Sequence, residues 1–202
     1  MKVTILGCGP SSGVPLVTGN WGDCDPENPK NFRSRPSIVV EQDGFRILID
    51  TSPDLRLQLL HNRIDHIDAV LYTHEHADHV MGIDDLRGIR RRRDELIDVY
   101  GPADVLASLK QRFRYLFSDT HDPDNMYKAV IKTHDITGPF SLGPFDCIVP
   151  VEQDHGICTS WGYRFGNFAY STDVVYLNDA AFEALAGIDT WIVDCLRDGE
   201  PH

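Results

Sequence analysis

Short apolar runs, separated by segments that contain glycine, proline and aspartate, recur along the chain. Runs of this length that are rich in valine, isoleucine and aromatic side chains are typical of buried strands. They predict strands at residues 2–8, 37–40, 45–49, 69–73, 99–100, 129–131, 145–151, 159–165, 168–171 and 190–193. Between the second and third runs, Gln42-Asp43-Gly44 predicts a hairpin turn, because Asp-Gly tolerates the positive φ angles of tight turns.

Helical spacing of apolar side chains alternates with these strands. It predicts helices from Pro53 to about residue 60, over residues 80–93 and 105–117, and over 178–185 with Asn178 as N-cap. Strand-rich blocks with interposed helices favour an α/β sandwich over an all-β barrel. Residues 9–35 differ, being rich in glycine, proline and asparagine without periodicity. Such a long loop is expected to form a wall or lid of a site, or else a plain surface excursion.

Composition narrows the class of protein. The 202 residues suit one domain, and a net charge of −12 disfavours broad capture of a nucleic acid while leaving a small anionic substrate possible. No apolar run approaches the length of a membrane helix and the first residues lack a signal-peptide pattern, so we expect a cytoplasmic protein without a membrane partner. Five scattered cysteines without a C-x-x-C pair indicate buried thiols, not a disulfide framework.

Four candidate metal ligands follow the strand predicted at residues 69–73. They are His74, His76, Asp78 and His79, in the pattern H-x-H-x-D-H. Because residues i and i+2 at a strand end point the same way, His74 and His76 can converge on one ion, with Asp78 and His79 displaced toward a second. Imidazoles with a carboxylate suit Zn(II), Mn(II) or Fe(II). Glu75, between the histidines, is expected to face solvent or to support a ligand.

This motif at a strand-to-helix junction resembles the signature of the metallo-β-lactamase superfamily of hydrolases. Asp50, His155 and Asp173 each follow a predicted strand, in the order that the family shows. The resemblance implies an α/β fold, the αβ/βα four-layer metallo-β-lactamase sandwich, as a single domain over residues 1–202. It also implies two divalent metal ions, with zinc or manganese expected.

The same resemblance implies a role for each residue. His74, His76 and His155 would bind the first metal, Asp78 and His79 the second, and Asp173 would bridge the two. Asp50 would hold a ligating histidine in its tautomer. Judged without the family, a strand-end aspartate such as Asp173 more often caps a turn.

One ligand of the family pattern is missing. The family supplies a last histidine from a strand near its C-terminus, whereas the only histidine after His155 is His202. We therefore expect either that the chain lacks the family's last strand and helix or that its second metal site is incomplete. His202, as a terminal residue, is expected to be frayed.

Three further segments indicate a branch of the superfamily. Residues 6–15, 29–37 and 49–56 resemble the PhnP-type phosphodiesterases, which are similar to the tRNA 3′-processing endonucleases. Of the cysteine-rich zinc site of that branch, only Cys24 is present. A basic cluster at Arg87 and residues 90–93 could attract phosphate but is more typical of a solvated helix end.

These features give a hypothesis for function. A hydroxide between two cations would attack a phosphodiester, including cyclic nucleotide or ribose cyclic phosphates, with Asp78 and Asp173 as catalytic residues. The expected partner is a small phosphoester, and an extended nucleic acid is not expected. The alternatives are a tRNA-processing nuclease, another hydrolase of the superfamily, or a non-catalytic metal-binding module.

Overall fold

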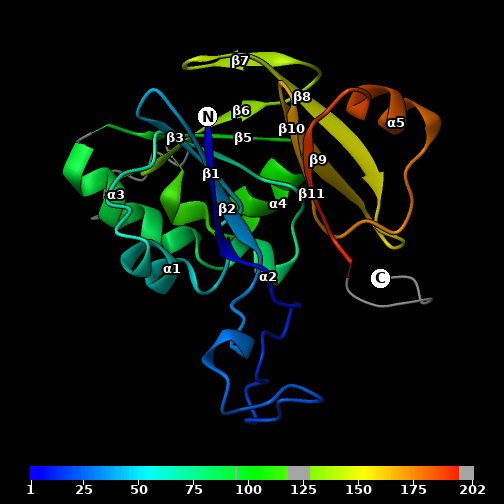
Figure 1. Cartoon of the computed structure of the whole chain (residues 1–202). Helices are drawn as coiled ribbons and strands as arrows, with labels where there is room; N and C mark the ends of the chain where they lie inside the picture. The colour runs from blue at the N-terminus through cyan, green and yellow to red at the C-terminus, as the bar shows by residue number, and fades with distance from the viewer. Residues whose placement is uncertain (94, 118–127, 196–202) are drawn as a thin grey trace. The chain divides into compact units, whose positions relative to one another are not determined.

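The computed structural model describes residues 1–93, 95–117 and 128–195 (Figure 1). The chain divides into two compact units, Met1–Asp135 and Ile136–His202, which are described separately. The expectation of a single domain stays a prediction.

A six-stranded sheet forms the centre of the first unit. Its strands lie in the order β1 (Lys2–Gly7), β2 (Ser37–Gln42), β3 (Phe45–Ile49), β4 (Ala69–Leu71), β5 (Ile97–Gly101) and β6 (Ile131–Asp135). The first three strands pair antiparallel and the last four pair parallel. The predicted hairpin is confirmed, because Gln42 pairs with Phe45 and both turn residues, Asp43 and Gly44, have positive φ.

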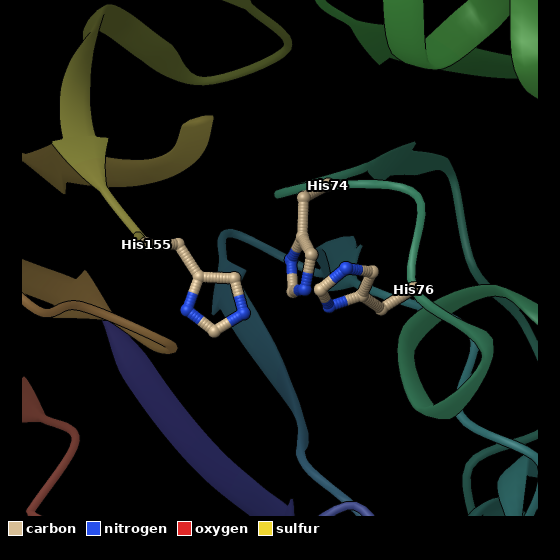
Figure 2. A group of neighbouring side chains, drawn as sticks. All are labelled: His74, His76 and His155. Atoms are coloured by element: carbon tan, nitrogen blue, oxygen red, sulfur yellow. The ribbon is translucent and has the colours of Figure 1, made fainter. Parts of the chain in front are cut away.

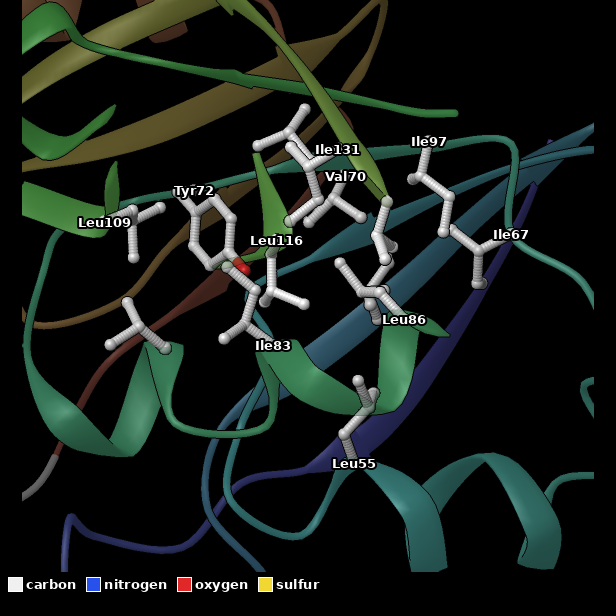
Figure 3. Close-up of a cluster of buried hydrophobic side chains, with 14 of the residues drawn as sticks. Leu55, Ile67, Val70, Tyr72, Ile83, Leu86, Ile97, Leu109, Leu116 and Ile131 are labelled. Carbon is white, nitrogen blue, oxygen red and sulfur yellow. The ribbon is translucent and has the colours of Figure 1, made fainter. Parts of the chain in front are cut away.

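The described part of the first unit contains seven helices, and all except η1 in the long loop bury side chains. They are η1 (Pro29–Asn31), α1 (Leu55–His61), α2 (Ala77–Val80), η2 (Ile83–Asp85), α3 (Leu86–Arg93), α4 (Ala103–Arg112) and η3 (Arg114–Leu116). Figure 3 shows Leu55, Leu86 and Leu109 of three helices in one cluster with the strand residues Val70 and Ile131. All five are fully buried, so the core fixes the edge where the parallel strands end.

The helix predicted over residues 80–93 was wrong, since the chain forms α2, η2 and α3 instead of one helix. Gly82 explains the break. A Cβ on Gly82 would collide with the carbonyl oxygen of Ser52, and the Gly82 N–H donates to the carbonyl of Thr51 at 2.9 Å. The helix predicted over 105–117 also ends early, because Phe113 leaves helical geometry (φ −122°, ψ 37°) before η3.

The second unit is a five-stranded sheet with one helix. Its order is β11 (Thr190–Val193), β10 (Phe168–Ser171), β9 (Thr159–Phe165), β8 (Phe145–Asp154) and β7 (Phe140–Leu142). Helix α5 (Asp179–Leu185, orange in Figure 1) packs Ala181 and Leu185 against Val151 and Ala169. Asn178 caps it as predicted, accepting from the N–H of Ala181 at 2.8 Å. Strand β7 was not predicted, and β6 starts at Ile131, where the predicted strand ends.

Two further expectations concern the surface. The prediction of buried thiols was wrong: Cys8, Cys24, Cys147 and Cys195 are exposed and Cys158 is half-buried. Among the helices of the described residues, none has the length and apolar character needed to cross a bilayer.

Candidate metal centre

Asp50 and Thr73 come together at one edge of the first sheet. They follow the parallel strands β3 and β4, whose carboxyl ends meet at that edge. The N–H of Thr73 donates to Oδ1 of Asp50 at 2.8 Å, and the N–H of Asp50 donates to the carbonyl of Leu71 at 3.0 Å. Asp50 has a φ of +62°, a conformation rare outside glycine. Residues keep such strained conformations where surrounding contacts hold them, often at functional sites.

The other carboxylate oxygen of Asp50 orients two histidines. Oδ2 lies 2.7 Å from Nδ1 of His79 and accepts the hydroxyl of Thr73 at 2.7 Å. That hydroxyl oxygen lies 3.0 Å from Nδ1 of His74. A proton on each Nδ1 completes both contacts and places the ring lone pair on Nε2, the atom that can bind a metal. The carboxylate therefore sets the tautomer of His79 directly and that of His74 through Thr73.

All four members of this network are buried. Burial raises the pKa of the Asp50 carboxyl above its ordinary value, and the contacts from His79 and Thr73 act in the opposite direction. Its charged form thus depends on these donors, because an unpaired carboxylate in the interior would be costly.

The imidazoles of the motif lie against one another. The ring centroids of His74 and His76 are 4.6 Å apart in an edge arrangement, and those of His74 and His79 are 4.2 Å apart. Figure 2 shows His74 and His76 side by side on the turn after β4. An oxygen of Asp78 lies 3.4 Å from Nε2 of His79. The first unit alone thus gathers three imidazoles and a carboxylate, a donor set that suits Zn(II), Mn(II) or Fe(II).

His155 and Asp173 lie at one edge of the second sheet. Strands β8 and β10 both pair antiparallel with β9, so they run in the same direction and end at the same edge. His155 directly follows β8, as Figure 2 shows, and Asp173 follows β10. Ser160 links the two ends, accepting from Nε2 of Gln153 at 3.1 Å and donating to the carbonyl of Asp173 at 2.8 Å. The second unit therefore presents an imidazole and a carboxylate together.

Asp173 resembles Asp50 in its backbone. Its φ is +51°, it is buried, and its Oδ2 accepts the hydroxyl of Thr172 at 2.8 Å. The metal-bridging role expected for Asp173 stays a prediction, as do the ligand roles of the other residues. His202 lies outside the described residues.

Sequence analysis missed a contact to the metal motif from α4. Arg112 donates from Nη1 to the backbone carbonyl of Glu75 at 2.7 Å and from Nη2 to its carboxylate at 3.1 Å. Glu75 therefore ties the turn between His74 and His76 to the end of a helix. Thr73, which directly precedes the motif, was also not singled out.

The long loop lines a cavity within the first unit. This cavity, of about 480 Å³, is bordered by Ser11, Ser12, Leu16, Val17, Thr18, Arg35, Pro53, Ala77 and Asp78. Residues of the loop thus form one wall of a cavity that reaches the histidine motif at Asp78. This agrees with the expectation that the loop is a wall and not a plain surface excursion. In the basic cluster, Arg92 pairs with Asp65 at 2.9 Å and Arg87 with Asp84 at 3.5 Å, as in a solvated helix end.

Comparison with known proteins places the chain in a family. Residues 45–202 match the model of the beta-lactamase superfamily domain. The crystal structure of a new diphosphatase from the PhnP family is 36% identical, with a TM-score of 0.85, over 99% of this chain and 75% of that one. The chain belongs to the beta-lactamase superfamily and, within it, to the PhnP family. The predicted superfamily, branch and metallo-β-lactamase fold are confirmed.

Two curated relatives are longer than this chain. An octanoyltransferase of Porphyromonas gingivalis (strain ATCC BAA-308 / W83) is 36% identical over 204 residues, covering 100% of this chain and 40% of that protein. A ribonuclease Z of Bradyrhizobium sp. (strain ORS 278) is 31% identical over 179 residues, covering 86% of this chain and 56% of that protein. The chain thus spans less than two thirds of either relative.

Proposed function

We propose that this chain is a metal-dependent hydrolase that cleaves phosphodiester bonds with the help of two divalent cations, zinc or manganese. The observation that carries the proposal is the contact of one Asp50 oxygen with His79 and, through Thr73, with His74. A buried carboxylate that fixes histidine tautomers is the arrangement that metal-binding histidines use. The names of two relatives, a diphosphatase and a ribonuclease, both denote hydrolysis at phosphorus.

The proposal assigns each residue a task. His74, His76 and His155 would hold one cation, Asp78 and His79 would hold the other, and Asp173 would be a ligand shared by both. When bound, a pair of divalent cations acidifies a water molecule and offsets the charge of the phosphoryl group. Asp50 keeps the proton of His74 and of His79 on Nδ1, so that the lone pair of Nε2 in each ring is available to a cation. Asp78 and Asp173 are the proposed catalytic carboxylates, which would balance the charge of the cations and align the attacking water.

The test combines metal content with turnover of bis(p-nitrophenyl) phosphate. The wild-type chain, loaded with zinc or manganese, should bind two ions and hydrolyse the diester. His76→Ala and Asp78→Ala should each lose turnover while their far-UV circular dichroism stays unchanged. His61→Ala, at the exposed end of α1, is the matched control and should behave as wild type. Full turnover in His76→Ala or Asp78→Ala would contradict the proposal.

A second candidate is a nuclease that processes RNA. Identity of 31% to a ribonuclease Z favours it, whereas a net charge of −12 opposes broad attraction to a polyanion. A panel of a precursor tRNA, a ribose cyclic phosphate and bis(p-nitrophenyl) phosphate distinguishes the two. Cleavage of the precursor tRNA alone would favour the nuclease, and one bound ion without turnover would favour a metal-binding module.

A further inference from the structure

Thr51 contacts the short helix α2 and the residue that follows it at three points. Its N–H donates to the carbonyl of His79 at 2.8 Å, and its hydroxyl donates to the carbonyl of Val80 at 3.2 Å. Its own carbonyl accepts the N–H of Gly82 at 2.9 Å. The last carbonyls of a helix have no partner within the helix and need donors from elsewhere. Because Thr51, His79 and Val80 are fully buried, water is a poor substitute for the donors that Thr51 supplies.

Tyr72 supports the hydroxyl of Thr51 from the core. Its phenol oxygen lies 2.7 Å from Oγ1 of Thr51, and its ring lies in the buried core cluster of the first unit (Figure 3). Because a threonine hydroxyl has one proton, and that proton is donated to the carbonyl of Val80, the phenol is the donor to Thr51. The N–H of Tyr72 donates to the carbonyl of Tyr100 at 2.9 Å, which ties the residue to β5. Two hydrogen bonds in series thus run from the core to α2.

Two consecutive residues hold His79 at two different points. Asp50 contacts Nδ1 of its ring at 2.7 Å, and Thr51 donates to its backbone carbonyl at 2.8 Å. The first contact orients the ring, whereas the second fixes the backbone from which the ring extends. Helix α2 has four residues, and isolated helices shorter than about 12–15 residues are marginal in water. The position of α2, and with it the positions of Asp78 and His79, therefore depends on contacts from outside the helix.

We propose that Thr51 and Tyr72 are positioning residues, which hold α2 so that Asp78 and His79 can bind the same cation. The inference rests on the proposed function, in which these two side chains would be ligands of the second cation. The hydroxyl groups of the pair act through the carbonyl of Val80 and touch neither cation nor substrate. They support the C-terminal end of α2, whereas the first two histidines of the motif precede this helix. The second cation should therefore depend on the pair much more than the first.

Two hydroxyl deletions test the inference through zinc affinity. Thr51→Val and Tyr72→Phe each remove one hydroxyl group and keep the shape of the side chain nearly unchanged. In competition with a chromogenic chelator, we expect each variant to bind its second zinc ion about ten- to a hundredfold more weakly than wild type and its first ion equally well. Thr51→Ser keeps the hydroxyl and should restore the affinity for the second ion.

A core variant controls for a general loss of stability. Ile97→Val, at a fully buried position of β5, lowers stability without removing a hydroxyl group and should bind both ions as wild type does. Equal weakening of both ions in Thr51→Val and Tyr72→Phe would overturn the inference. So would an unchanged affinity for the second ion in either variant.

Amide hydrogen exchange of the metal-free chain, followed by NMR, separates the inference from the proposed function. The N–H groups of Met81 and Gly82, which donate to the carbonyls of Ala77 and Thr51, report on the end of α2. In Thr51→Val and Tyr72→Phe we expect both amides to exchange about tenfold faster, the effect of one lost hydrogen bond, while strands β3 and β4 keep their rates. Equally faster exchange in these strands would overturn the inference. A wild-type chain that binds one ion, with both amides responding as expected, would contradict the proposed function and support the hold on α2.

Discussion

Asp50 and His79 form a buried hydrogen bond of 2.7 Å that joins the end of β3 to α2. The same carboxylate oxygen accepts the Thr73 hydroxyl, so one side chain supports two imidazoles from two directions. Removing it should disturb the histidines without removing any of the proposed ligands.

Asp50→Asn is the sharpest test of this relationship, because asparagine tolerates positive φ and keeps the shape of the side chain. Its amide has one oxygen that accepts and one NH2 group that only donates, so it cannot accept at both positions as the carboxylate does. We expect zinc affinity to fall by about ten- to a hundredfold, as when such supporting groups are lost elsewhere. Competition with a chromogenic chelator measures it. Asp43→Asn, an exposed aspartate with φ of +51°, is the control; wild-type affinity in Asp50→Asn would argue against the orienting role.

Arg112→Gln should loosen the turn that carries the first two histidines. The guanidinium donates to both the backbone carbonyl and the carboxylate of Glu75, so Arg112→Gln weakens both contacts. Glu75→Gln removes the charge of the carboxylate and leaves the contact to the backbone carbonyl in place. Both partners are partly exposed, so we expect a loss of about 0.2–1 kcal/mol in the free energy of unfolding for Arg112→Gln and a smaller loss for Glu75→Gln. Urea denaturation measures both. Equal losses would show that the backbone contact contributes nothing.

The histidine motif could be predicted from sequence because its residues are neighbours along the chain. The predicted strand, however, ends at Leu71 and not at residue 73, so the turn after β4 carries His74 and His76. The contact of Arg112 with Glu75 could not be predicted, since 37 positions separate the two residues and only the packing of α4 brings them together. The helix break at Gly82 could not be predicted for a similar reason. Helical spacing continues through it, and only the approach of the Ser52 carbonyl shows that the chain must turn there.

Two glycines near this break should respond oppositely to substitution. Gly82→Ala puts a methyl group against a backbone carbonyl that cannot rotate away, so we expect it to lower the free energy of unfolding by about 1–3 kcal/mol. Gly88, within α3, has open space at its Cβ position. Gly88→Ala should raise the free energy of unfolding by about 0.4–1 kcal/mol, because alanine lowers the conformational entropy of the unfolded chain. Urea denaturation of the two variants compares them directly. A neutral Gly82→Ala would mean that the chain between α2 and η2 shifts easily.

Removal of metal should lower stability as well as activity. A cation that binds only the folded chain stabilises it by RT ln(1 + [L]/Kd), about 2.7 kcal/mol when its concentration is a hundred times Kd. We therefore expect the melting temperature to fall on dialysis against a chelator and to recover when zinc or manganese is added. His76→Ala should show a smaller recovery, because His76 is a proposed ligand, whereas His61→Ala should recover fully. If the melting temperature of the wild-type chain were the same with and without metal, the histidine motif would not bind a cation in the folded protein.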